Sequence, residues 1–505
     1  MSQSAQTMAR ARWLAFAALC SMQMMIVIDI SVVTVALRSI QDDLGFEQAH
    51  LAWVTNAYTV GFGGLLLLAG RLGDLIGRKT VFLTGLVVFT GSSALCGLSR
   101  TQEMLIATRF VQGMGAAMAY AVLMSIVFTL FTEPRELGKA MGAFGFVVAS
   151  GASVGILAGA VVTDSISWHW VFFVNVPIGI AAGVLAGKLL PPDSPAGLGR
   201  GVDVLGAILV TGGLMLGVYT IATVGENGWG SVHTIGFGLG AIALLAAFVG
   251  REATADLPLI PLGIFRSRVI TGANLVHLLL VAATVSFNIL VALYLQQVVG
   301  YSPLATGFAF LPIAVFGAAA SLGLSARLTA AYGPRQVLLG SLAVLGAGLA
   351  LAIRTPVDPS YVVDILPVAV LVGAGGGLAM PAVLTLCMAI STPAEAGVAS
   401  GLSGTSGMVG DSLGIAALAV AAASYTNSRL AAGDSHAVAL TEGFHLAAGI
   451  ATGLAVAAFL VGLLVLRRVP SPPGPPGPGA PPTDAPPPVF ENAKSSTTAS
   501  GATSS

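Results

Sequence analysis

Three charged side chains stand inside long apolar runs of this sequence: Asp29, Arg109 and Asp411. An ionisable group inside a membrane helix is costly and is a functional hypothesis by default. A carboxylate withdrawn from water takes up a proton more readily, and a buried guanidinium needs an anion or a water-filled cavity beside it. These residue types predict a proton-coupling site and no covalent catalysis, so we assign no catalytic residue.

Each of the three also has an alternative interpretation. Asp29 could be a structural carboxylate held by hydrogen bonds to a neighbouring helix, because burial alone perturbs a carboxyl group without implying transport. Arg109 could belong to a static ion pair that fixes helix packing, and the sequence does not identify the partner carboxylate. Asp411 could be a second proton site, attract a cationic substrate or make a satisfied polar contact.

A short glycine-rich loop between two apolar runs carries a second set of charges. Its charges must lie at a water-facing surface, and its basic residues place that surface in the cytoplasm. An aspartate and an arginine four residues apart would meet on one helical turn. We interpret the loop as a gate, against the alternative of an ordinary positive-inside loop. Its candidate residues are Gly70, Gly73, Asp74, Gly77, Arg78 and Lys79.

The composition places these residues in a polytopic helical membrane protein. Of 505 residues, 55% are hydrophobic and only 9% are charged, far outside the usage of soluble domains. The formal net charge is +0, so no basic surface predicts a nucleic-acid partner. Cys20, Cys96 and Cys387 lie in apolar runs without metal-ligand spacing, so we expect neither a disulfide nor a metal site, and no cofactor.

Apolar runs of about 20 residues, each long enough to cross a bilayer, recur about fourteen times. An even number of spans puts both chain ends on one side. Most Arg and Lys residues between the runs fall on that side, which predicts cytoplasmic termini in a cell membrane. The runs lie near 13–37, 51–69, 81–99, 104–131, 139–163, 169–189, 203–224, 233–250, 269–298, 305–326, 336–354, 364–388, 398–423 and 442–466.

An internal repeat divides the chain. The loop around Gly333 and Arg335 aligns with the loop around Gly77 and Lys79. About eight spans separate the two loops instead of the six of equal halves, so we predict two inserted spans. The predicted segments are a cytoplasmic N-terminus 1–12, a six-helix bundle 13–189, two inserted helices with flanking cytoplasmic loops 190–268, a six-helix bundle 269–466 and a disordered Pro/Gly/Ser-rich cytoplasmic tail 467–505.

The motifs resemble those of a known transporter family. The gate loop resembles the signature loop between helices 2 and 3 of major facilitator superfamily transporters. Residues 28–37 resemble the first-helix motif of the fourteen-span drug–proton antiporters in that superfamily, and residues 109–116 resemble a fourth-helix motif. Small residues four apart allow close helix contact, and Gly151, Gly155 and Gly159 resemble the fifth-helix antiporter motif.

The resemblance implies an all-α major facilitator fold with two six-helix bundles and two inserted helices. In this family the aspartate at the position of Asp29 is implicated in proton coupling. The arginine at the position of Arg109 would hold the charge of a carboxylate or assist proton release. The family usually has glycine in its thirteenth helix where this sequence has Asp411, and proline in its fifth where this sequence has Ile156.

Several polar and aromatic residues inside the spans are candidates for lining a substrate cavity. A lone histidine on an apolar helix is more often structural than a proton relay, and the phenylalanines could equally serve packing. The candidates are Gln23, Asn56, Tyr58, Phe62, Asn274, His277, Phe287 and Gln296.

The function that we predict is proton-coupled efflux of hydrophobic or amphiphilic small molecules by alternating access. The expected partners are such a substrate, protons and the lipid bilayer, and we expect a functional monomer. An importer or uniporter of a small polar nutrient is the alternative, disfavoured because few polar residues lie inside the spans. A receptor or membrane enzyme would need a nucleophile–base pair, metal spacing or a phosphate loop, and the sequence has none of these motifs.

Overall fold

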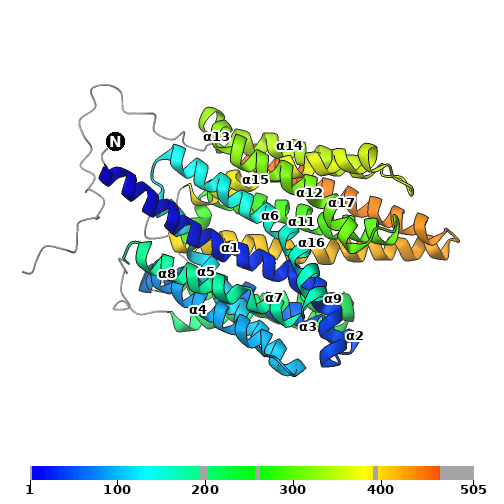
Figure 1. Cartoon of the computed structure of the whole chain (residues 1–505), viewed down its shortest axis with the longest axis horizontal. Helices are drawn as coiled ribbons and strands as arrows, with labels where there is room; N and C mark the ends of the chain where they lie inside the picture. The colour runs from blue at the N-terminus through cyan, green and yellow to red at the C-terminus, as the bar shows by residue number, and fades with distance from the viewer. Residues whose placement is uncertain (1–2, 193–202, 229, 256–261, 390–395, 467–505) are drawn as a thin grey trace, which may run out of the picture. The chain divides into compact units, whose positions relative to one another are not determined.

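Long helices make up the computed structural model of this chain, which describes residues 3–192, 203–228, 230–255, 262–389 and 396–466 (Figure 1). Thirteen helices in this part are long and apolar enough to cross a membrane. A further helix, α6 (Pro134–Ser165), has 32 residues, enough at about 1.5 Å per residue to span a bilayer as well. The proline-rich tail that we predicted to be disordered lies outside the described residues.

The first part of the chain folds into α1 to α8, and the helix bounds follow the apolar runs. Asp29 lies on α1, Asp74 on α3 and Arg109 on α5. The helices are α1 (Gln3–Leu44), α2 (Gln48–Leu51), α3 (Trp53–Ile76), α4 (Arg78–Gly97), α5 (Gln102–Leu130), α6 (Pro134–Ser165), α7 (His169–Phe173) and α8 (Asn175–Leu189).

The remaining described residues form nine further α-helices and three short irregular ones. Polar N-caps begin several of them, as when Ser267, Ser302 and Ser435 accept a hydrogen bond from a backbone N–H of the first turn. The helices are α9 (Val204–Asn227), α10 (Val232–Thr254), η2 (Leu262–Arg266), α11 (Arg268–Gln297), α12 (Pro303–Ala319), η3 (Ala320–Ser325), α13 (Ala326–Tyr332), α14 (Pro334–Ala352), η4 (Tyr361–Ile365), α15 (Leu366–Met388), α16 (Ala396–Ala431) and α17 (His436–Val465).

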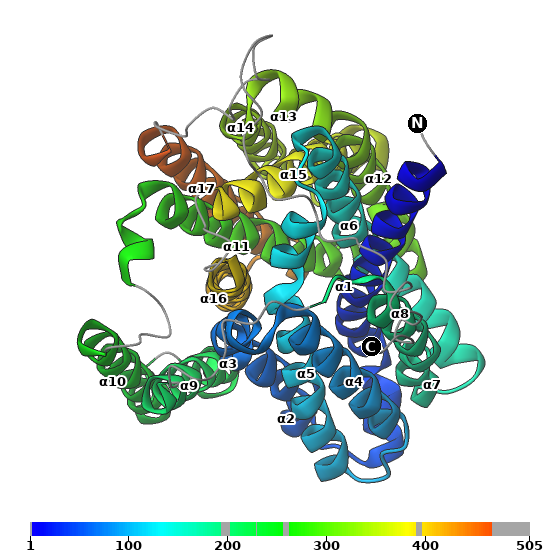
Figure 2. The same cartoon turned by 90° about the vertical axis from the view of Figure 1, so that its left-hand side faces the viewer.

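Neighbouring helices pack within two groups. In the first group α5 packs against α3 and α4, and α1 packs against α6 and α8. In the second, α11 packs against α16 and α17, and α15 packs against α12 and α14. The two groups meet where α16 packs against α3 and where α6 packs against α12 and η3 (Figure 2).

The predicted inserted spans are α9 and α10, which pack against each other and, through α9, against α3 (Figure 2). A Cβ atom added at Gly63 would stand 2.9 Å from Val218 of α9, so the two helices approach closely there. The rings of Trp53 and Tyr219 lie 5.6 Å apart at the N-terminal end of α3. Asp203 caps α9 by accepting from the N–H of Gly206.

The two loops aligned in the sequence have the same geometry. Gly77 and Gly333 both adopt positive φ, 109° and 82°, and a helix begins at the residue after each. Side chains rarely adopt this backbone region, which explains glycine at both positions. Lys79 donates to the carbonyl of Leu190, which follows α8, and Arg335 donates to the carbonyl of Leu463 at the end of α17.

Candidate functional site

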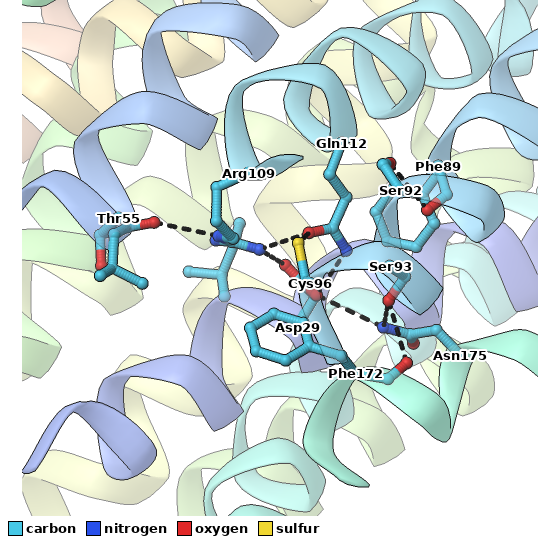
Figure 3. A network of polar contacts seen from close by, with 12 residues as sticks. Asp29, Thr55, Phe89, Ser92, Ser93, Cys96, Arg109, Gln112, Phe172 and Asn175 are labelled. Atoms are coloured by element: carbon cyan, nitrogen blue, oxygen red, sulfur yellow. Dashed lines mark hydrogen bonds and ion pairs between the residues drawn. The ribbon is translucent and has the colours of Figure 1, made fainter. Parts of the chain in front are cut away.

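Asp29 of α1 and Arg109 of α5 form an ion pair in the interior of the first helix group (Figure 3). The aspartate is 1% exposed and the arginine is fully buried. Breaking such a pair leaves an uncompensated charge in a medium of low polarity, so the two residues depend on each other. The pairing identifies the carboxylate partner of Arg109, which the sequence alone left open.

Two amides complete the environment of the Asp29 carboxylate. Gln112 Nε2 donates to Oδ1 at 2.8 Å, and Asn175 Nδ2 donates to the same oxygen at 3.3 Å. Asn175 is held in turn by Ser93 Oγ at 3.1 Å, and Ser93 donates to the carbonyl of Phe172 (Figure 3). The ion pair and the two amides therefore hold the Asp29 carboxylate in one orientation.

The guanidinium of Arg109 is fixed from several sides. Its Nε donates to the carbonyl of Val54 at 3.0 Å, and its Nη1 also donates to Gln112 Oε1 at 2.8 Å. The guanidinium carbon lies 4.4 Å from the centroid of the Tyr58 ring, within the range of a cation–π contact. Its Nη2 has no hydrogen-bond partner within the described residues, so this site keeps one unused donor.

The described side chains and carbonyls in contact with this ion pair come from the first helix group, namely from α3, α5, α7 and α8. A proton that reaches Asp29 would cancel its charge and weaken its bond to Arg109, leaving the guanidinium to find another acceptor. Protonation of Asp29 would therefore change the contact between α1 and α5.

Asp74 connects the two helix groups at the gate loop. Arg78 Nη2 lies 3.0 Å from Asp74 Oδ1, so the predicted pair forms, although Gly77 separates the end of α3 from the start of α4 instead of one continuous helical turn. The backbone N–H groups of Gly397 and Val398 donate to the same carboxylate at 3.0 and 3.1 Å. These donors belong to the first turn of α16, where unpaired N–H groups and the helix dipole favour a negative charge.

Glycines allow α3 and α16 to touch beside Asp74. A Cβ atom at Gly70 would stand 2.5 Å from the carbonyl oxygen of Gly397, and one at Gly401 would stand 2.8 Å from that of Leu66. Both distances are shorter than real Cβ contacts, so a side chain at either position would push the helices apart. The loop glycine Gly73 faces Val122 of α5.

The predicted glycine motif of the fifth span lies on α6 and faces α1. A Cβ atom at Gly151 would stand 2.8 Å from Val27, one at Gly155 would stand 2.7 Å from Ser31, and one at Gly159 would stand 2.9 Å from Val32. The three glycines therefore form one continuous seam against the helix that carries Asp29.

Asn274 and His277 of α11 bind two serines of α16. Ser406 donates to Asn274 Oδ1 at 3.1 Å, and Ser403 Oγ lies 3.3 Å from His277 Nδ1. Asn274 also donates to the carbonyl of Ile270 within its own helix. These contacts join α11 to α16 inside the second helix group.

Asp411 of α16 lies apart from the Asp29 network. It is partly exposed, takes part in no described ion pair, and its Oδ1 is buried without a hydrogen-bond partner. The structure therefore brings Asp29 and Arg109 together but gives Asp411 no bond to either.

The remaining cavity candidates occupy different environments. Tyr58 stacks on Phe62 with ring centroids 6.0 Å apart, and Phe287 packs against Phe444 of α17 at the same distance. Gln296 is exposed. The side chains of Gln23 and Asn56 each hold a buried polar atom, Oε1 and Nδ2 respectively, without a hydrogen-bond partner among the described residues.

Sequence reasoning did not assign roles to Gln112, Asn175, Ser93 or Cys96, although the Asp29 network includes them. Cys96 Sγ lies 3.5 Å from Gln112 Oε1. Gln112 follows Arg109 by three residues on one helix face, and Asn175 is a polar residue within an apolar run, so both carried a signal in the sequence. Ser93 and Cys96 carried none beyond their small size.

These features are those of a polytopic helical transporter: two packed helix groups, a buried ion pair and a charged loop that holds one group against the other. A model of the Major Facilitator Superfamily matches residues 19–415, and the chain belongs to this family.

Several curated relatives are similar over most of their length. The puromycin resistance protein of Streptomyces alboniger is 36% identical over 91% of this chain and 90% of that protein. The cephamycin export protein CmcT of Amycolatopsis lactamdurans is 37% identical over 83% of this chain and 86% of that protein. The tetracenomycin C resistance and export protein of Streptomyces glaucescens is 32% identical over 79% of this chain and 74% of that protein.

Solved structures show the same fold at low sequence identity. The human organic anion transporter MFSD10 has a TM-score of 0.62 and 14% identity, and covers 90% of this chain and 99% of its own. The proton:xylose symporter XylE has a TM-score of 0.60 and 13% identity, and covers 88% of this chain and 95% of its own. The predicted all-α major facilitator fold is confirmed.

Proposed function

We propose that this protein exports hydrophobic or amphiphilic small molecules, driven by protons that exchange at Asp29. The observation that carries the proposal is the enclosed Asp29–Arg109 ion pair, because ionisable groups inside membrane helices are costly and often mark proton or substrate pathways. The relatives named for antibiotic resistance and export support an efflux direction for this chain.

The proton acts by changing the charge of one carboxylate. Ionised Asp29 holds Arg109 and two amides, which favours the arrangement of α1 and α5 described above. Protonated Asp29 binds Arg109 less strongly, and the free energy of that difference biases the alternation between outward and inward states. Substrate binding and proton binding then oppose each other through the equilibrium between states, without any contact between the two ligands.

Asp74 supplies the gate. Its bonds to Gly397 and Val398 hold the gate-loop ends of α3 and α16 together, which is the outward-facing arrangement if the loop is cytoplasmic. Opening toward the cytoplasm requires those bonds to break and α16 to part from α3. Arg78, the first residue of α4, then remains as the partner of Asp74 and limits the free-energy cost of opening.

The membrane topology follows from the same proposal. We place the gate loop and both termini in the cytoplasm and treat 13–189 and 269–466 as two bundles that rock about a central cavity. The inserted helices in 190–268 attach to the first bundle through α9. The functional unit is one chain in the cell membrane.

The test is gradient-driven transport in inside-out membrane vesicles that are acidified inside by their own ATPase. Wild-type vesicles should accumulate puromycin or ethidium, and nigericin, which collapses the pH gradient, should stop accumulation. Asp29→Asn should abolish it in a protein that still reaches the membrane. Asp42→Asn is the matched control, because Asp42 lies exposed on the same helix and should be neutral. Accumulation that ignores nigericin, or full activity of Asp29→Asn, would overturn the proposal.

A further inference from the structure

Asp411 lies on α16, the helix that packs against α3. Beginning at Asp74, α16 contacts α3 through Gly397, Gly401 and Met408, and Met408 approaches Gly63. Asp411 follows Met408 by three residues and so lies almost one turn further along the same helix. Asp411 is partly exposed.

The direction of the Asp411 side chain follows from its neighbours on α16. One face of α16 carries Gly404 and Met408 against the first helix group, since a Cβ atom at Gly404 would stand 2.8 Å from the Tyr120 ring. An adjoining face carries Gly410 and Gly414 against the backbone of α11. At about 3.6 residues per turn, Asp411 lies on the border of these two faces. It therefore borders the space between the two helix groups.

The Asp411 carboxylate has an unused oxygen at this border. Its Oδ1 is buried without a hydrogen-bond partner, and no described Lys, Arg or His pairs with the carboxylate. A buried carboxylate oxygen without a donor is costly, so a ligand that supplies positive charge would be stabilised there. The Asp29 carboxylate, by contrast, has partners on both oxygens.

The surface next to Asp411 toward the gate loop is apolar and aromatic. Met408 lies one turn away, Tyr120 lies against Gly404 about two turns away, and the ring of Phe62 lies 5.7 Å from that of Tyr120 in an edge-to-face arrangement. Aromatic faces and a methionine bind apolar groups of varied shape, and aromatic rings also attract cations. The surroundings fit an organic cation better than a metal ion, which would require several oxygen ligands.

We propose that Asp411 binds the positively charged group of a lipophilic cationic substrate, with Met408, Tyr120 and Phe62 in contact with its apolar body. This inference rests on the proposed efflux function and names the class of substrate that the site takes. Asp411 would then act as a specificity residue on α16, the helix that the gate holds. Neutral substrates would bind to the apolar surface without using the carboxylate.

The experiment measures binding of three ligands of similar shape to the purified full-length protein in lipid nanodiscs, with empty nanodiscs subtracted. Tetraphenylphosphonium is a permanent cation, triphenylphosphine oxide is neutral and tetraphenylborate is an anion. Asp411→Asn keeps the side-chain size and removes the charge. It should weaken tetraphenylphosphonium binding at least about tenfold, leave the neutral ligand within about twofold and leave or improve the anion. Asp411→Glu should restore cation binding.

Several results would overturn this inference. One is that wild-type protein does not bind tetraphenylphosphonium below millimolar concentration. Another is that Asp411→Asn leaves the affinity for tetraphenylphosphonium unchanged. Equal loss of the cation and the neutral ligand would show that Asp411 serves packing.

Asp29→Asn separates this inference from the proposed function. It should lose gradient-driven transport but keep tetraphenylphosphonium binding, because Asp29 is enclosed by the first helix group. If cation binding depends on Asp411 while vesicles show no proton-driven accumulation, the binding site stands and the proposed coupling falls. If vesicles show proton-driven accumulation but cation binding does not depend on Asp411, only the proposed role of Asp411 falls.

Discussion

Asp74 Oδ1 lies 3.0 Å from the backbone nitrogen of Gly397, 323 positions further along the chain. One short side chain of the gate loop thus holds the first turn of a helix in the other half of the protein. The contact depends on two properties of α16: its first N–H groups lack partners within the helix, and its glycines let α3 come close. Larger side chains in place of these glycines would keep α3 and α16 too far apart for this contact.

Removal of the charge at position 74 should loosen the first turn of α16. Hydrogen bonds to charged groups contribute about 1.5–3 kcal/mol each, so Asp74→Asn should shift the equilibrium toward the inward-open state by about tenfold or more. Hydrogen–deuterium exchange of a peptide covering 396–402 should become faster. Asp364→Asn is the control, because Asp364 accepts from Ser360 N–H at the opposite end of the helices. Equal acceleration in both variants would contradict a specific role for Asp74.

Loss of one member of the ion pair should cost stability, and loss of both should cost less. Asp29→Asn leaves the buried Arg109 charge uncompensated, for which about 3–5 kcal/mol is typical. The double variant Asp29→Asn with Arg109→Gln removes that charge and should regain much of the melting temperature. Neither variant should transport against a gradient. If the melting temperature of the double variant falls by the sum of the decreases in the two single variants, the two charges do not depend on each other.

A methyl group in the glycine seam should be tolerated worse than one outside it. Gly155→Ala would put a Cβ atom 2.7 Å from Ser31 Cβ and 3.2 Å from Ile28 Cα. Such overpacking costs about 1–3 kcal/mol and should lower both thermal stability and transport. Gly91→Ala is the matched control, because nothing lies within 4 Å of a Cβ atom there and alanine favours a helix. Equal melting temperatures for the two variants would contradict the described packing of α6 on α1.

The stability contributed by the ion pair between Asp203, which caps α9, and Arg251 of α10 should depend on pH. The N–H of Gly206, with Arg251 3.0 Å away, lowers the pKa of Asp203 below its ordinary value. A lowered pKa gives stability that is full above the unfolded-state value of about 3.9 and is lost as the pH falls through the folded-state value. Asp203→Asn keeps a capping side chain but removes the charge. Its melting temperature should lie below wild type at pH 7, and the difference should shrink as the pH falls below about 4. A constant difference would mean that the charge is irrelevant.

Much of the fold was predictable from local patterns. Apolar runs gave the spans, and the aligned loops around Gly77 and Gly333 indicated two related halves with an insertion between them. The charged residues inside runs were visible too, because a lone Asp or Arg in about 20 apolar residues is conspicuous. These signals need no knowledge of how helices pack.

The tertiary partners were not predictable in the same way. Arg109 meets Asp29 across 80 positions, and Asn175 reaches the same carboxylate across 146. Such contacts depend on the rotation and tilt of each helix, which small differences in packing decide. The backbone donors of Gly397 and Val398 were also hidden, because every residue except proline has an N–H group and the sequence does not show which of them lacks a partner.

The enclosure of Asp29 within a single helix group has a consequence for how such transporters diversify. The described partners of the carboxylate belong to α5 and α8, whereas Asp411 and Met408 belong to α16. Under the proposed function, substitutions at these two positions of α16 can change which ligands bind without removing a partner of the proposed proton site. Related exporters could keep the same buried ion pair while their ligand specificity diverges on another helix.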